Sequence, residues 1–428
     1  MSEVQRTRAY AYAHSQFFKE FHRGATDAPL HEVPSLTKPV LMEHYDEVAT
    51  DPRIRLEGVR DHLDQLKRGS DELLLGEYRL CATSGSTGNP GLFIYNQDEW
   101  LWVLSGFWRS MELIGNSLNL TRRTRLAAIG SRVPYHPTRC VADALHSWWS
   151  PEMRLDVTAP IEELVDGLNQ WSPEILISYP SVASKLAAEQ IAGRLRITPR
   201  RVVTGAEPMW PEWRAAMEAA WGKCVHDEYG ATEPGAVATE CEEHHGLHLA
   251  EDLFVCEVVD ADNRPVPDGE IGEKALLTMF HRTTLPLIRY EMSDCLQLSP
   301  EPCPCGRPTR LIESIQGRIE DLVPVPGQHG GLVGIRPVAI NGVMEAAPVT
   351  AWQLQAEDGR LTLLLAELPL GYDESSIERE LNAVFQKQGG ALTPILVRRV
   401  ERIPRGSTGK TVPIVIKNPL PRSTTATA

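Results

Sequence analysis

From Ile161 onward, apolar runs of helical spacing alternate regularly with short, continuous apolar runs, and the connections between them are short. This alternation predicts a βαβαβ pattern, in which parallel strands form a sheet with helices on its faces. The predicted elements are a helix from Ile161 to Trp171, a strand from Glu174 to Tyr179, a helix from Pro180-Ser181 to Ala192, a strand from Arg201 to Thr204, a helix from Pro211 to Trp221 and a strand ending at Glu228.

The segments on either side follow other patterns. Residues 1–75 are predicted to be helical, and a Trp-rich helical segment precedes a short strand that begins at Ala127. Antiparallel strands are expected at Leu253 to Val259 and Lys274 to Phe280. After Asp321 the pattern predicts a smaller α+β unit, with strands Thr350 to Gln355, Arg360 to Leu365 and Ile395 to Val400 around a helix Glu374 to Gln388.

The predicted fold class is therefore α/β. A large N-terminal domain (residues 1–320) combines a parallel βαβ sheet with an antiparallel portion, and a small α+β domain follows (residues 321–418). A tail rich in Thr, Ser and Ala (residues 419–428) is expected to be disordered.

Composition narrows the class of protein. A chain of 428 residues with 42% hydrophobic and 23% charged residues is typical of a globular protein. Its net charge of −14 argues against nucleic acid or an anionic membrane as a partner. No apolar run is long enough to span a bilayer, so a cytoplasmic location is expected. Eight cysteines over this length do not indicate a disulfide scaffold.

One loop is suited to binding phosphate. Between Ala82 and Gly91 the chain reads ATSGSTGNPG, and such small residues allow successive backbone N–H groups to converge on anionic oxygens. The hydroxyl groups of this loop are further donors. A flexible Ser/Gly linker is the alternative interpretation. The loop is neither a Walker loop nor a Rossmann turn, because it lacks the Lys and the glycine spacing that those motifs require.

Three further loops follow predicted parallel strands, where ligands of such sheets bind. They are Tyr179-Pro180-Ser181, Gly205-Ala206-Glu207-Pro208 and Tyr229-Gly230-Ala231-Thr232-Glu233. The last is equally compatible with a plain helix start, capped by Thr232. Tyr135 and His136 occupy another loop, in which a solvated histidine is the alternative to a ligand contact.

Five motifs in order resemble the adenylate-forming enzymes. They are Thr83-Ser84-Gly85-Ser86-Thr87-Gly88, Glu228-Tyr229-Gly230-Ala231-Thr232-Glu233, Arg289-Tyr290 with Asp294, Gly317-Arg318 with Asp321, and Ser407-Thr408-Gly409-Lys410. Other segments resemble the phenylacetate-CoA ligase-like branch of that superfamily, over roughly residues 30 to 415. These are Tyr179-Pro180-Ser181, Gly205-Ala206-Glu207-Pro208, Gly246-Leu247-His248 and Cys303-Pro304-Cys305-Gly306-Arg307.

The resemblance implies activation of an aryl acid by ATP to an aryl-AMP, with release of pyrophosphate. It assigns the β,γ-phosphates of ATP to Thr83, Ser84, Gly85, Ser86, Thr87 and Gly88, the α-phosphate to Thr232 and Mg²⁺ to Glu233. Glu228, Tyr229, Gly230 and the backbone of Gly205, Ala206, Glu207 and Pro208 frame the nucleotide, Asp294 accepts the ribose hydroxyls, and Arg318 binds ribose or phosphate. The aryl acid is assigned to Tyr135, His136, Tyr179, Ser181, Gly230 and Ala231.

In this superfamily the small domain swings about a hinge that matches Asp321, and Lys410 bridges the carboxylate and the α-phosphate during adenylation. The chain departs from the family pattern after the hinge. The run from Leu322 to Leu332 contains no Lys or Arg, and Val412-Pro413-Ile414-Val415 follows the Lys410 motif in place of basic residues. Transfer to coenzyme A is the first interpretation. Transfer to an amine or a hydroxyl, in an amide or ester synthetase of secondary metabolism, is the alternative.

Cys241, His248, Cys303 and Cys305 form a further candidate site. Three thiolates and an imidazole suit a closed tetrahedral Zn²⁺ site, although the spacing alone fits four unrelated residues equally well. Similar cysteines in the ligase branch bind a structural metal, which favours zinc. His244 or His245 is an alternative fourth ligand. A non-catalytic relative that binds a nucleotide or acyl ligand is a third class of function, and a homodimer is left open.

Overall fold

The computed structural model describes residues 2–83, 90–116, 123–145, 150–318, 321–347, 349, 351–357, 359–366, 368, 372–404 and 412–417. These residues divide into two compact units. The first contains residues up to 292 together with 296–314, and the second contains residues 293–295 and the chain from 315 onward. The predicted boundary at residues 320 and 321 stays a prediction, because residues 319 and 320 lie outside the described ranges.

A nine-stranded mixed sheet has the strand order β13-β14-β9-β8-β7-β6-β5-β3-β4. The predicted α/β class and parallel sheet are confirmed, because β4, β3, β5, β6 and β7 run parallel to one another. The bounds are β3 Leu126–Gly130, β4 Glu152–Asp156, β5 Ile175–Ser178, β6 Arg201–Gly205, β7 Val225–Ala231, β8 Gly235–Glu240, β9 Leu247–Leu249, β13 Asp294–Leu298 and β14 Leu311–Arg318.

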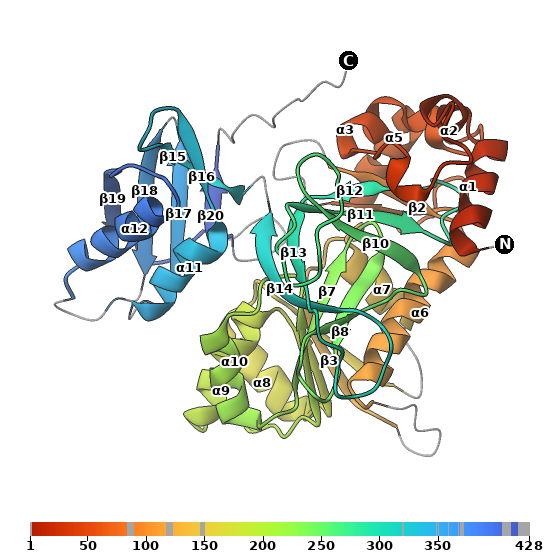
Figure 1. The fold of residues 1–428 in the computed structure, drawn as a ribbon. Helices are drawn as coiled ribbons and strands as arrows, with labels where there is room; N and C mark the ends of the chain where they lie inside the picture. Colours follow the sequence, from red (N-terminus) through yellow and green to blue (C-terminus); the bar gives the residue numbers. More distant parts are fainter. Residues whose placement is uncertain are drawn as a thin grey trace. The chain divides into compact units, whose positions relative to one another are not determined.

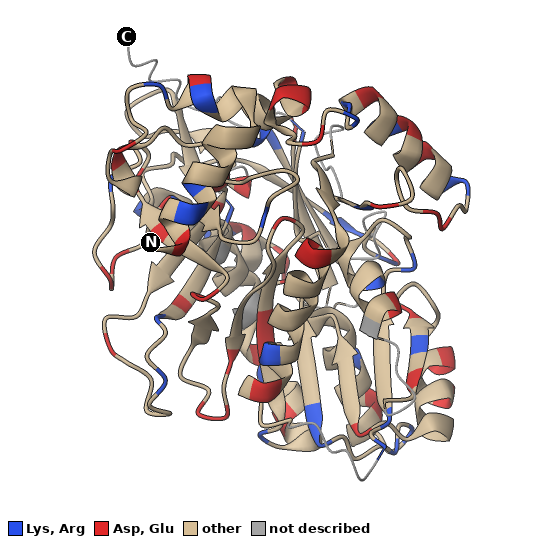
Figure 2. Ribbon diagram, turned by 90° about the vertical axis from the view of Figure 1, so that its right-hand side faces the viewer, with Lys and Arg blue, Asp and Glu red and all other residues tan. Residues whose placement is uncertain are grey.

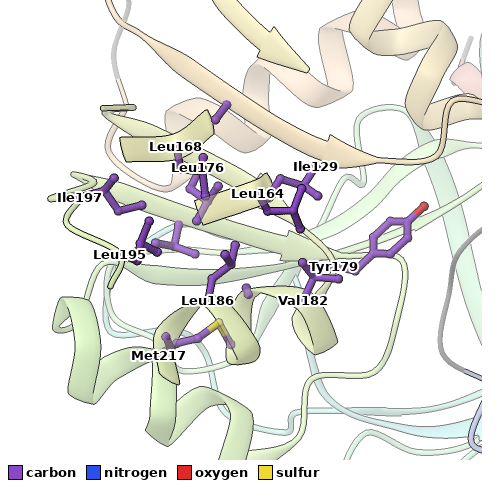
Figure 3. Packing of buried hydrophobic residues seen from close by; sticks show 14 of the residues in the cluster. Ile129, Leu164, Leu168, Leu176, Tyr179, Val182, Leu186, Leu195, Ile197 and Met217 are labelled. Atoms are coloured by element: carbon purple, nitrogen blue, oxygen red, sulfur yellow. The ribbon is translucent and has the colours of Figure 1, made fainter. Parts of the chain in front are cut away.

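Three helices, α8 (Ile161–Trp171), α9 (Pro180–Ile191) and α10 (Pro211–Trp221), connect the parallel strands. Their apolar residues meet those of the strands in one core (Figure 3), where Leu168, Leu176 and Leu186 are each fully buried. Another helix, α6 (Gln97–Leu113), packs against β8. The connections are as short as the sequence predicts, so the carboxyl ends of the parallel strands form one edge.

The rest of the first unit contains helices and two small sheets (Figure 1). The N-terminal helices are α1 Glu3–His14, α2 Gln16–Phe21, α3 Lys38–Glu43, α4 Tyr45–Val48 and α5 Leu56–Lys67, and α7 (Pro137–Leu145) follows β3. Strands β1 (Arg79–Ala82) and β2 (Leu92–Tyr95) form an antiparallel pair on either side of the glycine-rich loop. Strands β10 (Phe254–Val259), β11 (Lys274–Met279) and β12 (Tyr290–Met292) form an antiparallel sheet, as the apolar pattern predicts for the first two.

The second unit is built on a four-stranded sheet of order β19-β18-β17-β20. Its elements are β15 Val323–Pro326, β16 Leu332–Ile335, α11 Pro337–Ala346, β17 Ala351–Glu357, β18 Arg360–Ala366, α12 Ser375–Lys387, β19 Ile395–Arg399 and β20 Ile414–Ile416. Four elements of this unit are not predicted from the sequence. They are β15 and β16, which form a hairpin after the expected hinge, the helix α11, and β20, which pairs parallel with β17.

Acidic and basic residues are interspersed over the helices and loops in Figure 2. In the described part of the chain seen there, Lys and Arg do not form a continuous stripe of the kind that binds a nucleic-acid backbone. Among the described helices, none combines the length and the apolar character needed to cross a bilayer.

Candidate active site

The parallel sheet has a topological switch point between β3 and β5. The chain passes from β3 outward to β4, then crosses back to β5 on the other side of β3 and continues in that direction to β6 and β7. Ligands of open α/β sheets bind outside the carboxyl ends of the strands at such a point. The loop containing Tyr135 and His136 follows β3, and Tyr179-Pro180-Ser181 follows β5, so the topology brings two predicted substrate loops to this place.

The loop after β3 is tied to the start of the glycine-rich loop. The N–H of Ala82 donates a hydrogen bond to the carbonyl of Tyr135 at 2.9 Å. His136 is only 8% exposed and Nδ1 of its ring lies 3.0 Å from Oγ of Ser131, so the alternative of a solvated histidine is wrong. The imidazole is fixed by this contact instead of pointing into water.

Thr83 closes the base of the glycine-rich loop. Its N–H donates to the carbonyl of Gly91 at 3.0 Å, and its Oγ1 accepts a hydrogen bond from the N–H of Gly91 at 2.8 Å. Both ends of the loop are thereby joined to the β1–β2 pair. Five of the six predicted phosphate ligands, Ser84, Gly85, Ser86, Thr87 and Gly88, lie outside the described residues.

The loop after β6 approaches both of its neighbours closely. A Cβ added to Gly205 would lie 2.6 Å from the carbonyl oxygen of Glu228 on β7, and the next residue, Ala206, has a φ of +67°. Left-handed backbone at a residue other than glycine is costly and occurs often at functional sites. On the other side, Oε2 of Glu207 accepts a hydrogen bond from the N–H of Ser181 at 3.2 Å. The loops after β5 and β6 are therefore joined at the start of α9.

The segment from Tyr229 to Glu233 forms the end of β7 and the start of the turn of a β-hairpin. Strand β7 continues to Ala231 and pairs antiparallel with β8, with a register shift between Tyr229 and Gly230. The alternative of a plain helix start capped by Thr232 is therefore wrong. Such irregularities re-aim side chains and are frequent beside active sites.

Glu233 is held from two sides. Its side chain is 8% exposed, and Oη of Tyr290 donates a hydrogen bond to its Oε1 at 3.2 Å. The hydroxyl of Tyr95 lies 2.6 Å from the carbonyl oxygen of Thr232 and 3.0 Å from that of Glu233. Sequence reasoning did not find Tyr95 or this role of Tyr290, since both contacts join segments far apart in the chain.

Glu228 and Tyr229 project to opposite faces of the sheet, because neighbours on a strand alternate. Glu228 is opposite Thr239 in the β7–β8 ladder. Burial raises the pKa of Glu228 to about 7. The two side chains therefore cannot face one ligand together. A nucleotide that contacts the ring of Tyr229 meets at most the backbone of Glu228.

Asp294 and Arg318 are brought together within the second unit. Nε of Arg318 lies 3.3 Å from Oδ1 of Asp294, whose side chain is buried. A ribose diol binding to Asp294 would meet a guanidinium group beside it. Lys410 lies outside the described residues.

The four predicted metal ligands converge. Sγ of Cys241 is 3.6 Å from Sγ of Cys303, and Sγ of Cys305 is 3.4 Å from Nε2 of His248. These separations fit the edges of a tetrahedron around Zn²⁺, which are about 3.8 Å for two thiolates at a Zn–S distance of about 2.3 Å. Nδ1 of His248 lies 2.8 Å from Oγ1 of Thr309, a contact that orients the ring as metal-bound histidines require. The donor set therefore fits a closed zinc site.

His244 and His245, the alternative fourth ligands, lie elsewhere. His245 is exposed, and His244 gathers with His226 and Glu240. In that second group both oxygens of Glu240 already accept hydrogen bonds, Oε1 from Arg214 at 2.8 Å and Oε2 from the N–H of Asp227 at 3.0 Å. It is therefore best described as a closed hydrogen-bond network.

Comparison with known proteins gives three findings. Residues 78–276 match the family model of the AMP-binding enzymes. The phenylacetate-coenzyme A ligase of Thermus thermophilus is 32% identical over 42% of this chain and 41% of its own length. That of Aromatoleum evansii is 28% identical over 68% of this chain and 66% of its own length, so these alignments span less than two thirds of either relative.

A crystal structure of 2-hydroxyisobutyryl-CoA ligase in the postadenylation state is similar in fold, with a TM-score of 0.73 and 19% identity over 97% of this chain and 88% of that one. The matched segment, residues 78–276, contains the glycine-rich loop, the switch point and Glu233. Residues 78–276 therefore form an AMP-binding domain, and the chain is a relative of the phenylacetate-coenzyme A ligases among the adenylate-forming enzymes.

Proposed function

We propose that this protein is an ATP-dependent ligase that converts an aryl carboxylic acid to its acyl-AMP, releases pyrophosphate and transfers the acyl group to coenzyme A. One observation carries the proposal. The base of the glycine-rich loop, the loops after β3, β5 and β6, and the buried Glu233 all belong to the matched AMP-binding domain. Hydrogen bonds join the base of the glycine-rich loop to the loop after β3, and the loop after β5 to the loop after β6.

The adenylation step requires donors and positive charge at the phosphates before the reaction begins, because negative charges are forced together there. The hydroxyl and N–H groups of Thr83 to Gly88 would bind the β,γ-phosphates, and Thr232 the α-phosphate. Glu233 supplies one buried carboxylate, which fits Mg²⁺, since this ion is bound by one or two carboxylates together with substrate phosphates. When bound, Mg²⁺ neutralises phosphate charge.

The nucleoside would lie between the Gly205 to Pro208 loop and the ring of Tyr229, with Asp294 accepting the ribose hydroxyls beside Arg318. Gly205 has no Cβ, so its backbone lies close to β7, and Ala206 adopts the left-handed conformation next to it. A backbone without a side chain leaves a surface on which a flat ligand can lie. Lys410 of the small domain would bridge the attacking carboxylate and the α-phosphate.

The acid would bind at the switch point. Tyr135, His136, Tyr179 and Ser181 come from the two loops that meet there, and Gly230 and Ala231 belong to β7, which β6 separates from β5. Two tyrosines and an imidazole favour an aromatic acid, because aromatic rings pack well on one another. A Cβ at Gly230 would lie 3.0 Å from the carbonyl oxygen of Gly235, so glycine permits the close pairing of β7 with β8.

The zinc site would be structural. Cys241, His248, Cys303 and Cys305 complete a four-ligand set without an open position, and closed sets of this kind stabilise a fold. We assign them no part in the reaction.

A second candidate, transfer to an amine or a hydroxyl, is favoured by one observation. Coenzyme A carries phosphate groups, which proteins normally recognise with Arg or Lys. The hairpin β15–β16, which follows the expected hinge, contains neither residue. Arg336 comes directly after the hairpin, so its side chain is the nearest cation to the hairpin in the sequence. The backbone N–H of Arg336 donates to Oε1 of Gln388 at 3.1 Å.

The deciding experiment is an acid-dependent pyrophosphate-release screen over benzoates and phenylacetates. The preformed acyl-AMP is then offered to coenzyme A, an aryl amine and an aryl alcohol, and the products are identified by mass. Rapid thioester formation at micromolar coenzyme A supports the first candidate, and fast amide or ester formation beside a slow thioester supports the second. A chain that releases no pyrophosphate with any acid would refute both.

Lys410→Ala tests the division of labour between the domains. Adenylation should fall by about 10²-fold or more, because the ammonium group is needed while the carboxylate attacks. Consumption of chemically supplied acyl-AMP should be retained. Equal loss of both half-reactions would contradict the proposed role.

A further inference from the structure

The turn that carries Glu233 is attached to the interior by two buried tyrosines. Tyr95 Oη reaches the carbonyl oxygens of Thr232 at 2.6 Å and Glu233 at 3.0 Å, and Tyr290 Oη donates to Oε1 of Glu233 at 3.2 Å. Both tyrosines are almost completely buried, at 1% and 2% exposure. The main chain and the carboxylate of the turn are therefore fixed by separate donors.

Tyr95 is in turn covered by a cation. Cζ of Arg282 lies 3.9 Å from the centroid of the Tyr95 ring, and the Arg282 side chain is 3% exposed. Its Nε, Nη1 and Nη2 are all buried and have no hydrogen-bond partner among the described residues. Such burial of an unpaired charge is costly, and a ring face offsets only part of the cost. A residue kept at this energetic cost is expected to contribute to the site beside it.

Backbone hydrogen bonds beside Tyr95 and beside Arg282 hold the guanidinium group over the ring. Oε1 of Glu99 accepts hydrogen bonds from the N–H groups of Thr283 at 2.5 Å and Thr284 at 2.6 Å. Oε2 of the same carboxylate accepts from the N–H of Asn96 at 2.8 Å, which caps the first turn of α6. The segment after Arg282 is thus tied to the residue that follows Tyr95, and the guanidinium group is held over the ring.

A cation on the ring face draws electron density from the phenol and makes its hydroxyl a stronger donor. Burial raises the pKa of Tyr95 well above its usual value, with Arg282 acting in the opposite direction. The hydroxyl therefore keeps its proton at neutral pH and can donate it to the two carbonyl oxygens of the turn.

We propose that Arg282, Tyr95 and Tyr290 are positioning residues that hold the Thr232–Glu233 turn ready for the magnesium complex of ATP. This inference rests on the proposed function. Loss of these contacts would remove three hydrogen bonds that fix the main chain of the turn and the Glu233 carboxylate, and a misplaced ligand weakens binding far more than it weakens the fold.

The test compares three tyrosine-to-phenylalanine variants, each of which removes one buried hydroxyl. Tyr290→Phe should raise the dissociation constant of Mg²⁺–ATP by roughly tenfold, measured by calorimetry, because a hydrogen bond to a charged group is lost. Tyr95→Phe should do the same and also lower the melting temperature. Tyr45→Phe is the matched control, since the Tyr45 hydroxyl is equally buried and has no hydrogen-bond partner in the part of the chain that the structure describes. It should bind as the wild type does.

The dependence on magnesium separates positioning from stability. In the two positioning variants, half-saturation of pyrophosphate release by Mg²⁺ should shift upward, while the KM of the acid should stay within about twofold. A lower melting temperature with unchanged Mg²⁺ dependence would overturn the inference. If Tyr95→Phe does not fold, Tyr290→Phe and Arg282→Lys, which keeps the charge but loses the planar contact, decide the question. Wild-type protein that does not bind Mg²⁺–ATP would refute the proposed function instead.

Discussion

Gly205 at the end of β6 lies against the carbonyl oxygen of Glu228 on β7, so closely that a Cβ on Gly205 would be 2.6 Å from that oxygen. The contact sets the spacing of two loops that we assign to the nucleotide. It also turns the chain into the left-handed conformation of Ala206.

Gly205→Ala should therefore destabilise the protein by about 1–3 kcal/mol, because the added methyl group displaces main chain that has no room to move. Nucleotide affinity should fall with it. Gly130→Ala is the matched control, since Gly130 ends the parallel strand β3 of the same sheet and no described atom lies within 4 Å of the added Cβ. Urea unfolding measures both variants, and equal stability of the two would contradict the assigned role of the contact.

Glu207 joins the loops after β5 and β6 through the N–H of Ser181 at the start of α9. Glu207→Ala should lower the free energy of unfolding by about 1 kcal/mol. The substitution removes the hydrogen-bond acceptor of the Ser181 N–H and a negative charge at the N-terminus of α9. Because Glu207 holds the loop after β5, which we assign to the acid, the KM of the acid should rise as well. Glu212→Gln, at the exposed start of α10, should leave both quantities unchanged.

Much of this site can be predicted from the sequence, because the end of a strand can be identified from a short stretch of residues. The short connections after apolar strands predict that Ser181, Gly205 and Glu233 lie at one edge of the sheet. The cysteine pair Cys303 and Cys305 was equally visible from its spacing.

What the sequence did not reveal depends on contacts between distant segments. Tyr95 and Thr232 are 137 residues apart, and nothing local distinguishes Tyr95 from any buried strand tyrosine. The position of Glu228 opposite Thr239 became apparent only with the register of the β7–β8 ladder. The choice of His248 over His244 likewise required the fold of the loop between β8 and β9.

The raised pKa of Glu228 predicts how stability depends on pH. Burial raises this pKa to about 7, so the folded protein keeps a proton that the unfolded chain has already released. Stability from this group is complete below its ordinary pKa of about 4.3 and is lost as the pH rises through 7.

Glu228→Gln should therefore flatten the fall in melting temperature between pH 5 and pH 8 and should exceed the wild type in stability at pH 8. Part of the slope should remain, because burial and Glu240 also raise the pKa of Asp227 to about 7. A variant that follows the wild-type profile would show that Glu228 is ionised in the folded protein throughout this range.

The zinc assignment predicts both the zinc content of the purified protein and the effect of zinc on its thermal stability. Purified protein should contain about one equivalent of zinc by elemental analysis, because the four ligand atoms form a single closed set. Cys305→Ser should lower both the zinc content and the melting temperature, since metal binding contributes directly to folding free energy. Cys224→Ser is the control, because Cys224 is half-buried outside this group and its thiol donates only to backbone carbonyls. A wild type that is free of metal and as stable as after zinc addition would contradict the site. The distances between the thiols would then reflect packing alone.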